Sequence, residues 1–112
     1  ILIEEKFPVE ITNKKLYLTE TLFCDDALIL SGYTSKNISL KSNDHKRVVK
    51  FNFDSPLLGI WAKPNAPYVC IEPWWGVNDN YDKKNDLSEK RGIMALNAND
   101  SIAFNWNIEI TE

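Results

Sequence analysis

Alternation of apolar and polar residues constrains the fold of this chain more than any other feature of its sequence. In residues 101–110 every second side chain is apolar, namely Ile102, Phe104, Trp106, Ile108 and Ile110. Residues 46–53 repeat this pattern with Val49, Phe51 and Phe53. A period of two places such side chains on one face of a β-strand and the polar ones on the other. Both segments are therefore predicted to be half-buried strands.

Shorter apolar segments separated by polar turns extend the prediction. Further strands are predicted at 27–31, 37–41, 57–62, 67–72 and 92–96. The intervening segments 42–44, 63–65 and 97–100 are rich in Asn, Asp, Ser and Pro, which favour turns. Strands joined by short turns pair in antiparallel fashion, so the chain is predicted to be all-β, a sandwich or a barrel. Residues 18–26 are expected to form a short helical turn, and the polar residues 76–91 a long loop.

Length, charge and cysteine usage exclude several classes of protein. A chain of 112 residues allows one domain, and its formal net charge of −3 gives no basic surface for a nucleic acid. No apolar run is long enough to cross a membrane. Cys24 and Cys70 lie in apolar contexts and are expected to be buried free thiols, which favours a reducing, cytoplasmic location. Without a cluster of cysteine and histidine, no metal site is expected.

The first residues suggest a fragment. The chain begins Ile1-Leu2-Ile3, without Met and without the basic and apolar regions of a signal peptide. We therefore expect that residues upstream of this sequence were removed or are missing. The chain is predicted to be either a single domain over 1–112 or a C-terminal segment of a longer domain.

Residues 66–76, Ala-Pro-Tyr-Val-Cys-Ile-Glu-Pro-Trp-Trp-Gly, carry the strongest chemical signal. Pro73 is expected to interrupt the hydrogen-bond ladder, which places Glu72 at a strand end or a sheet edge. Trp74 and Trp75 are placed to shield this carboxylate from water, and a shielded carboxylate holds its proton more tightly, as a general base requires. The alternative is an exposed Glu72 with both tryptophans in the core.

Trp61 ends the preceding strand candidate. If the two strands are neighbours, Trp61 lies near Glu72, and an aromatic face beside a carboxylate is typical of sugar binding. A tryptophan packed in the core is an equally good interpretation. Of the pair Asp25-Asp26, one side chain is expected to cap or to bind. His45, the only histidine, is expected at the surface without a catalytic or metal role.

Several of these motifs together resemble one protein family. Leu22-Phe23, Asp26-Ala27-Leu28, Leu58-Gly59-Ile60-Trp61, the segment 67–76 and Glu89-Lys90-x-Gly92-Ile93 occur in this order. In this arrangement the chain resembles the C-terminal part of the aldose 1-epimerase (galactose mutarotase) family, and most of all its LacX-like bacterial branch. The resemblance extends from about residue 18 to the end of the chain.

The resemblance implies a fold, an activity and a set of site residues. The fold is an antiparallel β-sandwich that forms part of a galactose mutarotase-like supersandwich, and the activity is metal-free, cofactor-free interconversion of the α and β anomers of an aldose. By its position in the motif, Glu72 corresponds to the glutamate that takes the proton from the anomeric hydroxyl. Asp26, Trp61 and Trp74 are the implied substrate-binding residues.

The chain departs from the family pattern in three respects. It is considerably shorter, and the family's catalytic histidine and substrate-binding arginine lie in an N-terminal part that has no counterpart here. His45 is not in the position of that histidine, and Arg91 replaces a residue that is usually acidic. We therefore expect weak or no activity from this chain alone, and completion by a missing N-terminal half or by a homo-oligomer. The alternatives are a non-catalytic carbohydrate-binding module, or a structural fragment that completes the sandwich of another chain.

Overall fold

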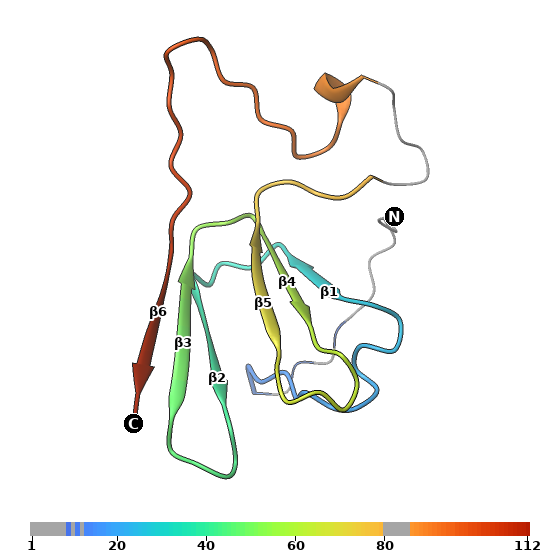
Figure 1. Ribbon diagram of the computed structural model, residues 1–112, viewed down its shortest axis with the longest axis vertical. Coiled ribbons are helices and arrows are strands. Elements are labelled where there is room, and N and C mark those ends of the chain that lie inside the picture. Colours follow the sequence, from blue (N-terminus) through green and yellow to red (C-terminus); the bar gives the residue numbers. More distant parts are fainter. Residues whose placement is uncertain (1–8, 10, 12, 80–85) are drawn as a thin grey trace.

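The computed structural model describes residues 9, 11, 13–79 and 86–112. Their strands form two antiparallel sheets of three strands each (Figure 1). The first sheet has the order β1 (Leu28–Ser31), β4 (Leu57–Trp61) and β5 (Cys70–Trp74). The second sheet has the order β2 (Asn37–Lys41), β3 (Val48–Phe53) and β6 (Trp106–Thr111). The predicted fold class, an all-β antiparallel sandwich, is confirmed.

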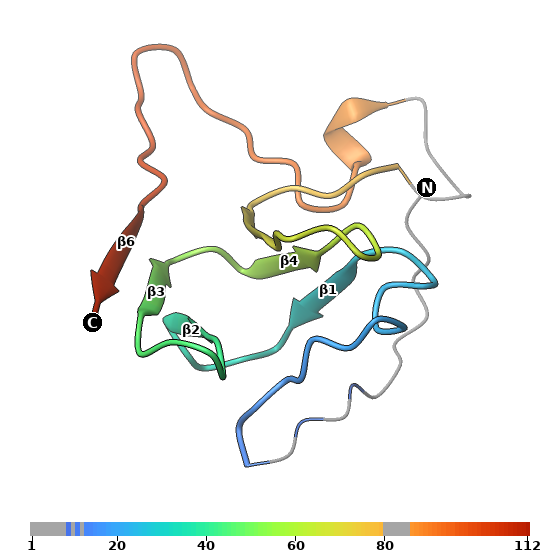
Figure 2. The ribbon, with the colours of Figure 1, turned by 60° about the horizontal axis from the view of Figure 1, so that its bottom comes forward.

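The hydrophobic core joins the two sheets. It consists of a pair of side chains from β3, a pair from β4 and one from the turns before β1: Phe51, Phe53, Leu58, Ile60 and Phe23. Strands β3 and β4 follow each other closely in the sequence but belong to different sheets, so the chain passes from one sheet to the other between them (Figure 2). Burial of these alternating apolar side chains is the driving force for bringing the sheets together.

Ser55 and Tyr33 fix this crossing between the sheets. Ser55 is almost fully buried, and its hydroxyl donates a hydrogen bond of 2.7 Å to the carbonyl of Leu57. The Tyr33 hydroxyl donates to the carbonyl of Ser55 at 3.0 Å, and its ring lies edge-on to Phe53 at 5.6 Å. Burial raises the pKa of the Tyr33 hydroxyl, although its hydrogen bond with Ser55 acts in the opposite direction.

The segment before β1 forms consecutive turns, as the sequence predicts. Backbone N–H groups of Leu22, Cys24 and Asp26 each donate to the carbonyl three residues earlier. This winding places Phe23 in the core and leaves Cys24 exposed. Both cysteines are free as expected, but the expectation that both are buried is wrong, because Cys24 faces away from the core and Cys70 is only half-buried.

Two predicted strands differ from the observed ones in the last third of the chain. Residues 92–96 are not a strand, and residues 101–105 remain unpaired, so that β6 begins only at Trp106. Within the described residues, no neighbouring strand lies beside this segment, and a strand cannot form without one. Every residue of β6 is exposed, so the predicted half-burial of this strand is also wrong.

Strand β5 begins later than predicted and continues through Pro73. The expectation that Pro73 ends the ladder is therefore wrong, whereas the expectation of an edge position is confirmed, because β5 is an outer strand of its sheet. An edge strand tolerates proline, since it needs N–H donors toward one neighbour only.

The polar residues 76–91 form the predicted loop where they are described, and residues 80–85 lie outside the described part of the chain. The described part of the loop contains the 3-10 helix η1 (Leu87–Glu89), which Asp86 caps at its N-terminus. The Asp86 carboxylate accepts hydrogen bonds from the hydroxyl and the backbone N–H of Ser88, and these bonds lower its pKa. No helix in the described ranges has the length and apolar character to span a membrane.

Candidate functional site

The outward face of β4 and β5 brings together most of the residues singled out in the sequence. The two strands are antiparallel, and Gly59 lies opposite Glu72 while Leu57 lies opposite Trp74. Because successive residues of a strand point to opposite faces, the buried Leu58 and Ile60 mark the inner face of β4. Gly59, Glu72 and Trp74 therefore share the outer face of this sheet.

A hydrogen bond connects the two functional side chains of β5. The indole Nε1 of Trp74 donates to Oε2 of Glu72 at 3.0 Å. Residues two apart in a strand lie on the same face, which is why a Glu-x-Trp sequence permits this contact. The bond fixes one carboxylate oxygen, and Oε1 accepts no hydrogen bond from any described residue.

Gly59 makes room for this arrangement. A Cβ built on Gly59 would lie 3.1 Å from Nε1 and 3.2 Å from Cε2 of Trp74, and 3.5 Å from Cβ of Glu72. The indole thus lies directly across the backbone of β4 at the one position without a side chain. A larger residue at position 59 would occupy the space of the ring, so glycine is a positioning element of this site.

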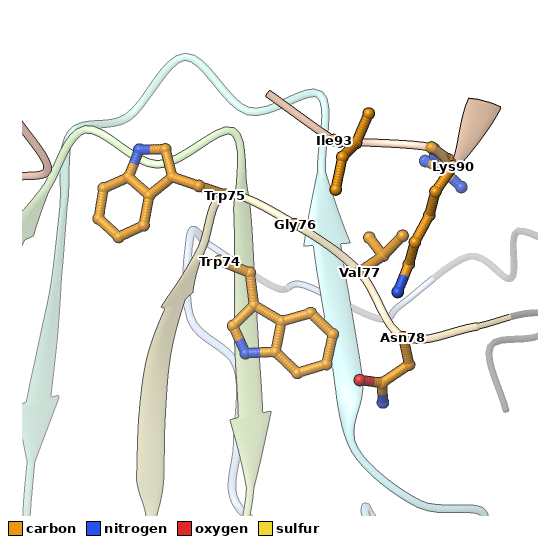
Figure 3. Close-up of a pocket in the computed structure, with 8 residues that line it drawn as sticks. Trp74, Trp75, Gly76, Val77, Asn78, Lys90 and Ile93 are labelled. Carbon is orange, nitrogen blue, oxygen red and sulfur yellow. The ribbon is translucent and has the colours of Figure 1, made fainter. Parts of the chain in front are cut away.

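Glu72 is exposed, and Trp74 and Trp75 are only half-buried. The expectation that both tryptophans shield Glu72 from water does not hold for the described residues. Figure 3 shows that the two indoles point to different sides of the chain, so they do not enclose the Glu72 carboxylate together. The ring of Trp75 packs instead against Phe104, with ring centroids 4.8 Å apart.

A cavity of about 420 Å³ opens beside Trp74 (Figure 3). Its walls come from the end of β5 and from the two ends of the following loop: Trp74, Trp75, Gly76, Val77, Asn78, Lys90, Arg91 and Ile93. This volume is within the usual range for a site that binds a small molecule. The indoles offer apolar faces, while the amide and the two cations can donate hydrogen bonds to hydroxyl oxygens.

The two ends of the loop are held together. Gly92 has a φ of +75°, and a Cβ there would lie 3.4 Å from the Cα of Gly76. Lys90 Nζ forms an ion pair of 3.0 Å with Oδ1 of Asp79. These contacts hold the residues before and after η1 beside each other at the cavity. The sequence signals for them are a glycine at each end of the loop and opposite charges within it, and spacing alone does not connect these residues.

Trp61 lies close to Glu72, as the strand pairing predicts. It pairs with Cys70, two residues before Glu72, and such diagonal neighbours have Cα atoms about 7–8 Å apart in general. Trp61 is half-buried, contacts the core, and lies 6.3 Å from Tyr68 between ring centroids. Trp61 thus packs against the core and also lies near Glu72, so each of the two interpretations accounts for some of its neighbours.

Asp26 and His45 lie apart from Glu72. Asp26 precedes β1, and β4 separates β1 from β5, so two strand spacings divide the two carboxylates. Its Oδ1 accepts a hydrogen bond of 2.8 Å from the N–H of Ala27, beside a φ of +90°. His45 is exposed in the turn between β2 and β3, in the other sheet. In the described part of the chain, no three His, Cys, Asp or Glu side chains gather to hold a metal ion.

Comparison with known proteins finds two relatives. The plasmid and the chromosomal LacX proteins of Lactococcus lactis subsp. lactis are each 26% identical to this chain over 110 residues, which is 96% of the chain. The chain spans only 37% of the length of these relatives. No protein-family profile matches the sequence, and no solved structure matches the chain. The similarity to LacX thus extends over nearly the whole of this chain.

Proposed function

We propose that this chain supplies the proton-accepting side of an aldose 1-epimerase, with Glu72 as the general base. The observation that carries the proposal is the carboxylate of Glu72, which Trp74 holds at 3.0 Å on an outward sheet face beside a cavity of about 420 Å³. A fixed carboxylate next to an aromatic ring suits a sugar, because the ring covers C–H groups while the carboxylate accepts hydroxyl protons. The resemblance to the epimerase family and the similarity to LacX support it.

The chemistry assigned to Glu72 is the removal and later return of one proton. Its free oxygen, Oε1, takes the proton of the anomeric hydroxyl, and the electron pair of that O–H bond forms the C1 carbonyl. The bond between C1 and the ring oxygen breaks, and the ring oxygen receives a proton from an acid. Rotation about C1–C2 and closure in the reverse sense give the other anomer, and Glu72 returns the proton.

The acid of this reaction comes from outside the chain. The only histidine, His45, lies in the other sheet and in an exposed turn. A single acid or base contributes roughly a hundred- to ten-thousandfold in rate, so the chain without its acid is expected to be weak or inactive. The active protein is then a full-length polypeptide or an assembly that includes further residues.

The proposal is tested by replacing Glu72 with glutamine in the full-length protein. Glu72→Gln keeps the shape of the side chain and a hydrogen-bond acceptor for Trp74 but removes the base. Polarimetry on freshly dissolved α-D-galactose and α-D-glucose is expected to show a loss of roughly a hundredfold or more. Glu20→Gln, at an exposed position in the turns before β1, is the matched control and should retain the full rate. Wild-type rates in Glu72→Gln would overturn the assignment.

A second candidate is a sugar-binding module without turnover. The exposure of Glu72 and its separation from His45 favour this alternative, since both allow binding but supply no acid. The two candidates give different results with the wild-type, full-length protein. A module quenches or shifts Trp fluorescence in a saturable way when sugar is added, yet it leaves the rate of mutarotation at that of the buffer.

A further inference from the structure

We propose that the cavity beside Trp74 selects an aldose that carries a phosphate group, and that Lys90 and Arg91 bind this phosphate. The inference rests on the proposed function, because it names the class of sugar on which Glu72 acts, and it adds a binding site for a second group of that sugar. The anomeric hydroxyl must be free for the reaction, so the phosphate is attached to a carbon other than C1.

The charges around the cavity carry the inference. Among the described residues its walls contain two cations, Lys90 and Arg91, and the side-chain amide of Asn78, but no carboxylate. The chain as a whole has a net charge of −3, so the cavity differs in sign from the rest of the molecule. A neutral sugar needs hydrogen bonds but no countercharge, whereas a phosphate monoester carries about −1.5 to −2 at neutral pH. The cavity therefore complements a phosphorylated sugar better than a neutral one.

Lys90 is held in position at the cavity. Its Nζ lies 3.0 Å from Oδ1 of Asp79, and its side chain is 31% exposed. Figure 3 shows this side chain extending from the segment after η1 toward Val77 and Asn78. The ion pair balances part of the charge and fixes the ammonium, and an ammonium has three N–H donors, so one ion pair does not use them all. Lys90 is thus placed to donate to a bound anion.

Arg91 supplies a charge that is not balanced within the described part of the chain. Its side chain is exposed, and it forms no ion pair with a described residue. A guanidinium can donate two parallel hydrogen bonds to phosphate oxygens, a geometry that an ammonium does not offer. With Lys90 and Asn78 beside it, the donors match the three terminal oxygens of a phosphate monoester better than the two oxygens of a carboxylate.

The indole of Trp74 connects this cavity with the proposed base. Its Nε1 donates to Oε2 of Glu72 at 3.0 Å, and the same side chain lines the cavity. Glu72 itself is not part of the lining, so the carboxylate and the two cations lie at different places around the indole. A sugar stacked on the ring can direct C1 toward Glu72 and a distant phosphate toward the cations. This separation also limits the repulsion between the phosphate and the carboxylate.

The test measures kcat/KM with the full-length protein by exchange NMR, for D-glucose, D-galactose and the 6-phosphate of each, after subtraction of the buffer rate. The wild-type protein is expected to prefer the 6-phosphates at least tenfold. Arg91→Gln keeps a hydrogen-bond donor but removes the charge, and it is expected to lower this preference about tenfold, the effect of one hydrogen bond to a charged group.

Arg47→Gln is the matched control for the loss of charge. Arg47 is exposed in the turn between β2 and β3, where it forms an ion pair with Glu112, and it lies in the other sheet. Its replacement changes the net charge by the same amount and should leave the preference for the 6-phosphates unchanged. Equal kcat/KM for phosphorylated and parent sugars would overturn the proposal, as would a preference that Arg91→Gln does not lower. Equal use of D-glucuronate and the 6-phosphates would assign the cations to a carboxylate and overturn it as well.

A binding measurement separates this proposal from the proposed function. D-galactose 6-phosphate and D-galactose are titrated into full-length Glu72→Gln, which lacks the base, and binding is followed by Trp fluorescence. Tighter binding of the 6-phosphate, weakened about tenfold by the additional change Arg91→Gln, supports the phosphate site. If this result is found but no sugar is interconverted by the wild-type protein, only the proposed function fails. Equal affinity for the two sugars overturns the phosphate site, whatever the rates of mutarotation.

Discussion

Replacement of Gly59 by alanine separates the geometry of the site from the stability of the fold. The added Cβ would lie 3.1 Å from Nε1 and 3.2 Å from Cε2 of Trp74, closer than the usual contact of about 3.5–4.0 Å between such atoms. The indole is the end of a half-buried side chain, so it moves rather than the strand. Its hydrogen bond of 3.0 Å to Glu72 is then lost.

The magnitude for Gly59→Ala follows from two opposing effects on the free energy of unfolding. Loss of this hydrogen bond to a charged group is expected to cost about 1 kcal/mol, below the usual range of about 1.5–3 kcal/mol because the bond is exposed to water. Alanine in place of glycine within a strand regains about 0.5–1 kcal/mol. Stability is thus expected to change by about 1 kcal/mol or less. A carboxylate displaced by about 1 Å, in contrast, is expected to lower the rate of mutarotation by about a hundredfold.

The assay measures urea denaturation by Trp fluorescence and mutarotation by polarimetry on the same full-length preparation. Gly32→Ala is the matched control, because a Cβ there meets nothing within 4 Å but the φ of +71° disfavours a side chain. It is expected to cost about 1–2 kcal/mol in stability and to leave the rate intact. The reasoning is refuted if Gly59→Ala keeps both the wild-type rate and the wild-type Trp emission.

Two further predictions concern the fold. Burial raises the pKa of Tyr33 above its ordinary 10.0, so the unfolded chain releases this proton at a lower pH than the folded chain does, and stability should fall as the pH rises above 10.0. Tyr33→Phe should make this decline less steep in urea titrations. An unchanged decline in the variant would contradict the contribution of Tyr33. Leu58→Ala, at a side chain only 2% exposed, should cost about 2–5 kcal/mol, whereas Leu87→Ala, at 67% exposure, should cost less than about 0.5 kcal/mol; equal losses would contradict the assignment of the core.

The sequence predicts the pairing of strands better than their burial. Alternation in 46–53 predicts β3 and the inward positions of Phe51 and Phe53, because both a partner strand and a covering sheet lie within the chain. The same alternation in 101–110 predicts a half-buried strand, yet only 106–111 pairs and its face is exposed. A period of two shows which side chains share a face, and it does not show whether anything covers that face.

The candidate site could be predicted in part. The carboxylate of Glu72, its edge position and the nearness of Trp61 all follow from the motif and from the pairing of consecutive strands. The contact of Trp74 with Glu72 depends on a rotamer, and the space for it depends on Gly59 of another strand. These residues are connected only by the strand register, in which Gly59 lies opposite Glu72. That register cannot be predicted from composition and spacing.

Exchange NMR on the anomeric protons of D-galactose and D-glucose, in the presence of the full-length protein, tests the role of Glu72 directly. Cross-peaks between the α and β anomers are expected with the wild-type protein, and they are expected to disappear in Glu72→Gln while the folded spectrum of the protein is retained. Cross-peaks of equal intensity in the two proteins would contradict the role of Glu72 as the base.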